Sequence, residues 1–229
     1  MDAQVWSALL VSVKVASFAT LLCLPPALLI GRWLARGSKL RHGVVETLCT
    51  LPLVLPPTAV GFLLLAMLGV DGPHGREGLG LDLLLTWQGA VLASAVMAFP
   101  LVLRGARVAF EEVDPRLESM GESLGLSRWR VWTRVSLPLA RRGLIAASVL
   151  GFGRALGEFG ATLLVAGNLP GETQTLSMLI WEDIQLGQDG RALTLVGLTA
   201  VLAFALLFVV ERLSRSRGAA RSRSSEVEG

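Results

Sequence analysis

The sequence contains no tyrosine, two cysteines, two histidines and only two lysines, Lys14 and Lys39. Neither lysine lies in a Gly-x-x-x-x-Gly-Lys-Ser/Thr loop, the motif that binds ATP phosphates, so we do not expect the chain to hydrolyse ATP by itself. His42 and His74 fall on opposite sides of an apolar stretch, and no Cys/His cluster has metal-ligand spacing. We also find no plausible pair of nucleophile and base. The sequence therefore predicts a protein that is not an enzyme and binds no cofactor or metal of its own.

Charged residues are scarce as well, at 17% of the chain against about 25% in ordinary soluble domains. Hydrophobic residues make up 52% and the mean hydropathy is +0.60. They are gathered in long blocks rather than in the 3.6-residue stripe of a soluble helix. Blocks of about 18 or more apolar residues can cross a bilayer. Five such blocks are present, at residues 5–30, 44–70, 83–102, 143–167 and 192–210. We expect an all-α membrane protein with five transmembrane helices embedded in a lipid bilayer.

Basic residues mark one side of this arrangement. They are concentrated after the first and third blocks and in the tail, whereas the connections after the second and fourth blocks hold one arginine each. Because lysine and arginine accumulate at the cytoplasmic ends of spans, this alternation predicts an N-terminus outside and a C-terminus in the cytoplasm. It also explains the net charge of +3 without a nucleic-acid partner. The transmembrane domain would occupy residues 1–213, and the Ser- and Arg-rich residues 214–229 would form a disordered basic tail.

The connection between the third and fourth blocks carries helical signals of its own. Asp114 followed by proline is a typical helix start, and Gly125 a typical stop. Ser127 can cap a second short helix, on which Trp129 and Trp132 are three residues apart. Tryptophan and arginine are frequent in binding hot spots, but they also anchor helices at the lipid headgroups. From the residues alone, the loop is either a docking surface or an interfacial helix.

Two intramembrane segments contain residues that apolar helices rarely carry. Pro52, Pro56 and Pro57 fall within one block, which must kink or break there. Such backbone is tolerated at membrane depth only when it is buried in protein or faces water, so the segment is either a gate or a packing kink. Arg154 and Glu158 are four residues apart and would share a helix face. They either brace the helices as an ion pair or line a pathway for an anion.

The loop also resembles a known family. Gly125 followed, after nine residues, by Val-Ser-Leu-Pro at 135–138 is similar to the "EAA…G…I-LP" loop of binding-protein-dependent ABC importer permeases. In its first half the match is weaker, because Ser119 stands at the family's glutamate and Glu118 lies one position early. The resemblance implies that residues 111–138 form a coupling loop that docks onto a separate ATPase. The coupling residues would be Glu118, Gly125, Ser127, Arg128, Trp129, Arg130, Trp132, Leu137 and Pro138.

The segments 51–58, 153–162 and 167–173 narrow the resemblance to the molybdate permease subfamily, and the similarity extends from Lys14 to Arg212. It implies a homodimer in the inner membrane of a prokaryote, joined by two ATP-binding cassette subunits that hold ATP and Mg and by an extracytoplasmic molybdate-binding protein. Candidates for the pathway or gate are Pro52, Pro56, Pro57, Thr58, Arg154 and Glu158. Sulfate, thiosulfate or tungstate as cargo, and a secondary transporter that uses no ATP, are the alternatives.

Overall fold

The computed structural model describes residues 3–37, 40–69, 72–74 and 82–225, and within these ranges all regular structure is helical. The helices are α1 (Ala3–Ala35), α2 (Leu40–Val54), α3 (Pro57–Leu68), α4 (Trp87–Glu111), α5 (Pro115–Ser123), α6 (Arg128–Val131), the π-helix η1 (Trp132–Ser136), α7 (Leu137–Leu156), α8 (Gly160–Ala166), α9 (Leu176–Gln185) and α10 (Asp189–Ser225). The chain is therefore all-α, as its composition predicted.

Four helices among the described residues are long and apolar enough to cross a membrane: Ala3–Ala35, Trp87–Glu111, Arg128–Leu156 and Asp189–Phe208. The helices α2 and α3 are bent by 108° at the break between them. A fifth crossing results if this bent pair is counted as one broken span. The break falls between Val54 and Pro57, where the prolines predicted a kink or a break. Residue 70, the expected end of this span, lies outside the described residues.

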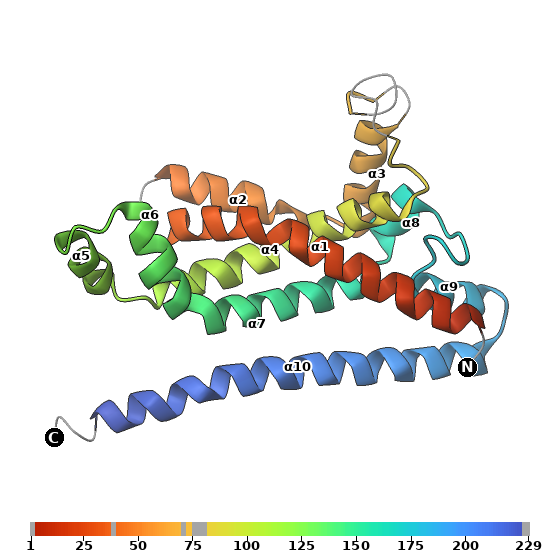
Figure 1. Ribbon diagram of the computed structural model, residues 1–229. Helices are drawn as coiled ribbons and strands as arrows, with labels where there is room; N and C mark the ends of the chain where they lie inside the picture. The colour runs from red at the N-terminus through yellow and green to blue at the C-terminus, as the bar shows by residue number, and fades with distance from the viewer. Residues whose placement is uncertain (1–2, 38–39, 70–71, 75–81, 226–229) are drawn as a thin grey trace.

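The core of the molecule lies where α1, α4 and α7 run side by side (Figure 1). Small residues allow this close packing. A Cβ atom on Gly105 of α4 would lie 2.5 Å from the Cβ of Ala147 on α7, and one on Gly151 would lie 2.2 Å from Val102. Since neither position has room for a side chain, small residues set the distance between α4 and α7. The last helix, α10, packs against α7 and α9 on one side of the bundle.

The two ends of the bundle differ in structure. The segments α5, α6 and η1, which we call the foot, lie at one end, together with the last turns of α1 and the first turns of α2 (Figure 1). At the opposite end lie α3, α8, α9 and the beginning of α1. The far end of α10 points toward the foot. The foot is thus separated by the length of the bundle from the short helices α3, α8 and α9 at the other end.

Two boundaries differ from the expected spans. The third span continues to Glu111 rather than to residue 102, and the fourth is shifted, since its helix runs from Arg128 to Leu156 and then breaks before α8. The break contains Gly157 and the buried carboxylate of Glu158. Apolar composition alone did not reveal it, because α8 continues the apolar block after the break.

The helix α10 continues to Ser225 and so includes residues 214–225, for which the composition favoured disorder. A helix that is already formed extends at little cost through residues such as alanine and arginine, because nucleation is the expensive step. Residues 226–229, the rest of the expected tail, lie outside the described residues.

Candidate functional site

The foot is built from the helix signals that the sequence predicted. The side chain of Asp114 accepts a hydrogen bond from the backbone N–H of Arg116 at 2.8 Å, which caps α5. The helix is followed by Gly125, whose φ of +84° is a conformation that glycine adopts readily. Ser127 then caps α6 by accepting from the N–H of Arg130 at 3.4 Å. The foot is therefore a helix–turn–helix with a sharply defined turn.

The π-helix η1, the last segment of the foot, continues into α7 without a gap. The backbone N–H of Leu137 donates to the carbonyl of Trp132, five residues earlier. Proline at position 138 has no N–H and would clash with the carbonyl four residues before it in a regular α-helix. The wider π turn removes that conflict, so α6, η1 and α7 form one unbroken helical segment from Arg128 to Leu156, which we call the rod. The rod is bent, because α6 runs across the direction of α7 (Figure 1). A displacement of the foot would be transmitted directly to the span.

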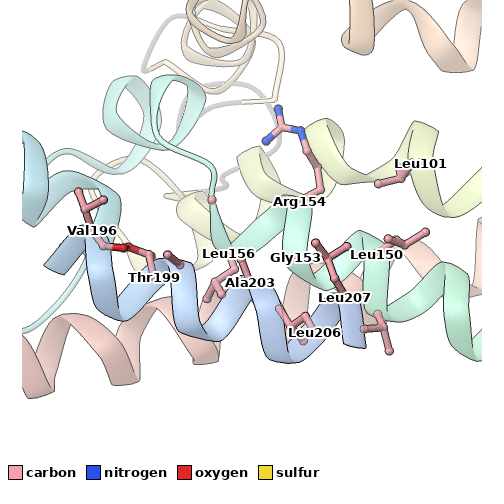
Figure 2. A pocket seen from close by; sticks show the side chains of 13 residues that line it. Leu101, Leu150, Gly153, Arg154, Leu156, Val196, Thr199, Ala203, Leu206 and Leu207 are labelled. Atoms are coloured by element: carbon pink, nitrogen blue, oxygen red, sulfur yellow. The ribbon is translucent and has the colours of Figure 1, made fainter. Parts of the chain in front are cut away.

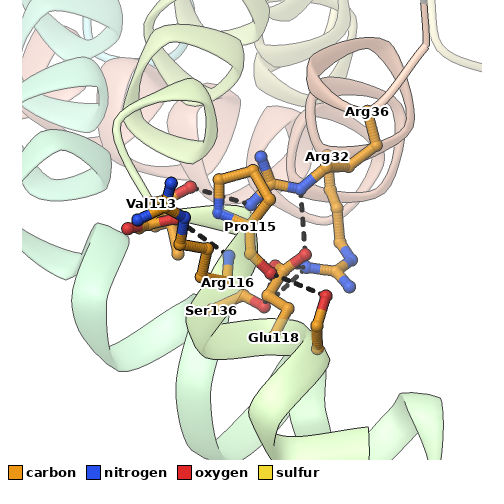
Figure 3. A network of polar contacts seen from close by, with 9 residues as sticks. Arg32, Arg36, Val113, Pro115, Arg116, Glu118 and Ser136 are labelled. Carbon is orange, nitrogen blue, oxygen red and sulfur yellow. Dashed lines mark hydrogen bonds and ion pairs between the residues drawn. The ribbon is translucent and has the colours of Figure 1, made fainter.

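A second connection ties the foot to α1 (Figure 3). The carboxylate of Glu118 on α5 accepts hydrogen bonds from Arg32 on α1 at 2.7 Å and from Arg36, in the turn directly after α1, at 2.9 Å. It also accepts from the hydroxyl of Ser136, and Arg36 donates a further bond to the carbonyl of Val113 at 3.1 Å. Only 13% of the Glu118 side chain is exposed. Three segments of the chain thus meet at one carboxylate.

The surroundings of Glu118 also set its protonation. Burial raises the pKa of a carboxyl group, but the hydrogen bonds from Arg36, Ser136 and Arg32 and the charge of Arg32 outweigh this effect. The pKa of Glu118 is lowered from 4.5 to about 2. The carboxylate therefore stays ionised at any physiological pH, and the ion pairs to α1 persist with it.

At the opposite end of the bundle, the α2–α3 break presents the proline segment. Pro52 lies inside α2 and is half-buried, whereas Pro56, Pro57 and Thr58 are exposed at the break and in the first turn of α3. The nitrogens of Ala59 and Val60 both donate to the carbonyl of Pro56, which satisfies the backbone where the new helix begins. The structure confirms the break, and three of the four candidates in this segment are exposed there.

The second break, between α7 and α8, is organised by Glu158. Its carboxylate accepts a hydrogen bond from Arg154 at 2.8 Å and another from the backbone N–H of Ala161 at 2.9 Å. The Glu158 side chain is 1% exposed and that of Arg154 is 27% exposed. The expected ion pair is present, but α7 ends at Leu156, between its two members, so they do not share a continuous helix. Glu158 instead bridges the end of one helix and the start of the next.

Arg154 lies at the edge of an apolar cavity of 610 Å³ between α7 and α10. In Figure 2 its guanidinium points away from Thr199 and Ala203 of α10. The two breaks themselves adjoin, because a Cβ atom on Gly160 of α8 would lie 3.2 Å from Pro57 and 3.4 Å from Thr58. The structure therefore brings together Pro57, Thr58 and the Glu158 break, while Pro52 lies apart on α2.

Comparisons with known proteins agree with this architecture. The family model described as "Binding-protein-dependent transport system inner membrane component" matches residues 27–218. The chain belongs to this family. It is therefore the transmembrane permease component of an ABC importer. The match includes the foot, both helix breaks and most of the bundle.

Curated relatives of this permease are similar over nearly their whole length. The molybdenum transport system permease protein ModB of Escherichia coli (strain K12) is 41% identical over 214 residues, which cover 92% of this chain and 93% of that protein. The putative molybdenum transport system permease protein YvgM of Bacillus subtilis (strain 168) is 38% identical over 215 residues, with 91% and 93% covered.

Solved structures share the fold at lower identity. The bacterial alginate ABC transporter, solved in complex with a periplasmic protein bound to an alginate pentasaccharide, gives a TM-score of 0.72 at 18% identity and covers 94% of this permease and 80% of that chain. An inward-facing MetNI methionine ABC transporter gives 0.67 at 18% identity, with 94% and 99% covered. At this identity the likeness shows the fold of the permease alone.

The predicted coupling residues of the permease fall into two groups. Five are exposed on the outer side of the foot, namely Gly125, Ser127, Arg128, Trp129 and Arg130, and Pro138 is exposed farther along the rod. Trp132 and Leu137 are half-buried and pack against the core cluster that contains Phe110. The Trp129 ring lies 4.6 Å from that of Trp132. Glu118 faces inward to α1, so its side chain holds the foot in place rather than presenting itself to a partner.

The predicted coupling residues do not include the outer face of α5. Met120 and Leu124, four residues apart, are 61% and 83% exposed and line a shallow groove together with Ser119. Gly121 faces the other way, where a Cβ atom would lie 3.3 Å from Val131 of α6. A small residue is therefore needed at the crossing of α5 and α6. The signal in the sequence that could have indicated this surface is the i, i+4 spacing of two apolar residues, Met120 and Leu124.

Proposed function

We propose that this permease carries molybdate across the inner membrane of a prokaryote and is driven by a separate ATPase that binds the foot. The observation that carries the cargo assignment is the 41% identity to a molybdenum transport permease over 92% of the chain. The resemblance of segments 51–58, 153–162 and 167–173 to molybdate permeases supports the same cargo. Molybdate, tungstate and sulfate are tetrahedral dianions, so the binding protein outside the membrane would do most of the discrimination among them.

The foot supplies the support for the coupling part of the proposal. Met120, Leu124 and Trp129 expose apolar surface at the end of the bundle that the basic residues assign to the cytoplasm. Exposed apolar surface beside arginines favours a protein partner, and tryptophan and arginine dominate the energy of many interfaces. ATP and Mg would be bound by that partner. The continuous rod from Arg128 to Leu156 would carry its movement to the helix breaks.

The remainder of the assembly follows from the family. Two copies of the permease would form a homodimer with the pathway between them, two ATPase subunits would bind the feet, and an extracytoplasmic molybdate-binding protein would deliver the anion. The exposed break at Pro56, Pro57 and Thr58 supports a role for this segment in the gate, since irregular backbone at membrane depth must be covered by protein or line a water-filled path. In this proposal Arg154 and Glu158 brace the break.

The test is uptake of labelled molybdate into proteoliposomes that contain the permease, its ATPase and the binding protein. We expect uptake that requires hydrolysable ATP and is inhibited by vanadate. Excess tungstate should compete strongly and excess sulfate weakly. Uptake driven by an ion gradient without ATP would favour a secondary transporter, and stronger competition by sulfate than by tungstate would assign the permease to sulfate or thiosulfate.

A further inference from the structure

A basic pocket lies beside the foot, where α1 ends and α2 begins. It has a volume of 620 Å³ and is lined by Leu29, Arg32 and Trp33 of α1, by Arg36 and Gly37 directly after α1, and by Arg41 and His42 of α2. Arg32 and Arg36 reach it from the network that holds Glu118 (Figure 3). No part of the proposed coupling or pathway uses this pocket.

The pocket has an excess of positive charge. Among the described residues, the only carboxylate bonded to its arginines is that of Glu118, which is shared by Arg32 and Arg36. Arg41 forms no hydrogen bond or ion pair within the described part of the chain. The nearest carboxylate on α2, that of Glu46, is bonded to Arg107 of α4. Three guanidinium groups therefore face one cavity with one carboxylate among them.

The arginines also retain unused hydrogen-bond donors. Arg32 donates to Glu118 and Ser136 through Nη1, and Arg36 donates through Nε and Nη2. A guanidinium group has five N–H donors, so Nε and Nη2 of Arg32 and Nη1 of Arg36 remain available. An anion in the pocket could bind them without displacing Glu118. It would also reduce the repulsion among the three cations.

His42 adds an independent sign of an incomplete site. The residue is 8% exposed, and its ring stacks on Trp33 with the centroids 4.0 Å apart. Its Nδ1 atom is buried and has no hydrogen-bond partner among the described residues. His42 and Arg41 lie in the first turn of α2, which carries no acidic side chain. The dipole at the start of a helix also favours an anion.

Part of the pocket lining is apolar. Leu29 and Trp33, one turn apart on α1, are 57% and 39% exposed beside the arginines. Basic pockets at the ends of membrane helices are known binding sites for anionic lipid headgroups. We propose that this pocket binds an oxyanion of the phosphate class, carried by an anionic phospholipid headgroup or present as a free dianion. The apolar part of the lining provides the surface along which an acyl chain of such a lipid would lie.

The test compares binding to the purified full-length complex and to two variants. Arg41→Gln removes a pocket charge that does not touch Glu118, and Arg104→Gln removes an exposed arginine of α4 outside the pocket. Bound phosphatidylglycerol is measured by native mass spectrometry after extraction from vesicles of phosphatidylcholine and phosphatidylglycerol. Inorganic phosphate and molybdate are each titrated in calorimetry against lipid-depleted complex.

We expect Arg41→Gln to weaken binding about fivefold, the effect of one basic residue near an anionic surface. Arg104→Gln should bind as the unchanged complex does, and Arg41→Lys should recover most of the loss.

Retention of phosphatidylglycerol without binding of free phosphate or molybdate identifies the lipid as the source of the anion. Binding of a free anion that displaces the lipid identifies the free dianion. The proposal is overturned if the unchanged complex binds none of the three, or if Arg41→Gln binds as tightly as Arg104→Gln. Neither readout depends on transport, so failure here leaves the proposed function standing.

Discussion

At the scale of single residues, Glu118 joins the foot to the rest of the permease. Its carboxylate is bonded to Arg32 on α1, to Arg36 directly after α1 and to Ser136 on η1. Hydrogen bonds to charged groups contribute about 1.5–3 kcal/mol each, and the loss of one partner leaves the others unsatisfied. The position of the foot under the bundle therefore depends on this one side chain more than on any other polar residue of α5.

We expect Glu118→Gln to destabilise the detergent-solubilised permease by about 1.5–3 kcal/mol and to lower the amount of ATPase that co-purifies with it. The amide keeps the size of the side chain but cannot pair with two guanidinium groups. Glu122→Gln, an exposed position on the same helix, is the matched control and should change neither quantity. Equal thermal midpoints for the two variants would contradict the role of the network.

The same residue predicts a pH dependence. Its pKa is about 2 in the folded chain against an ordinary 4.5, so the folded state favours the ionised form. The stability from this group is thus fully present above pH 4.5 and is lost as the pH falls toward 2. We expect the difference in thermal midpoint between the unchanged permease and Glu118→Gln to be constant near neutral pH and to shrink below pH 4.5. A difference that already disappears between pH 7 and pH 5 would show that another group carries it.

For Glu158 we expect a structural effect rather than a change of cargo. Glu158→Gln removes the partner of Arg154, and breaking a buried ion pair costs about 3–5 kcal/mol. The assembled complex should lose stability in size-exclusion chromatography, while the ratio of molybdate to sulfate uptake by the remaining complex stays unchanged. Normal assembly combined with an altered ratio would instead place Arg154 and Glu158 in the pathway.

At the scale of elements, the turn of the foot depends on Gly125. Its φ of +84° costs other residues about 1–2 kcal/mol, and its N–H donates to the carbonyl of Glu122 at 2.9 Å. Gly125→Ala should reduce ATP-driven uptake in part. Gly125→Pro, which can adopt neither the angle nor the hydrogen bond, should abolish it while the amount in the membrane stays normal. Gly190→Ala, where a Cβ atom meets nothing within 4 Å, is the control. Normal uptake by Gly125→Pro would refute a defined turn.

Local signals predicted much of the foot and one of the two breaks. The starts of α5 and α6 followed from Asp114 and Ser127, because a cap acts within three residues of the helix start. The α2–α3 break followed from its prolines. The end of α7 did not, because it depends on Glu158 binding a side chain and a backbone N–H at once. The inward direction of the Glu118 side chain could not be predicted from local signals either, because its partner Arg32 lies 86 residues away in the sequence.

At the scale of the whole molecule, one rod connects the two candidate regions. The segment Arg128–Leu156 contains 29 residues and no break. Its longest part, α7, has 20 residues and at 1.5 Å per residue is about 30 Å long, enough to cross the hydrocarbon core of a bilayer. Its first turn carries Trp129, and its last residue is followed by the Glu158 break that adjoins Thr58. This geometry gives a physical reason why binding at the foot would move the gate candidates.

The central claim, that an ATPase binds the foot and drives transport through it, is tested most directly by Trp129→Ala. Trp129 is 65% exposed on the foot, and Trp6, which is 55% exposed on α1 at the opposite end of the bundle, provides the matched Trp6→Ala control. Loss of an interface hot spot costs about 2 kcal/mol or more, which corresponds to roughly thirtyfold weaker binding. The measurement is ATP-driven uptake of labelled molybdate by the reconstituted complex, together with the affinity of the ATPase for the permease. Our account predicts that Trp129→Ala loses both and Trp6→Ala keeps both, and it is contradicted if Trp129→Ala binds the ATPase and transports molybdate normally.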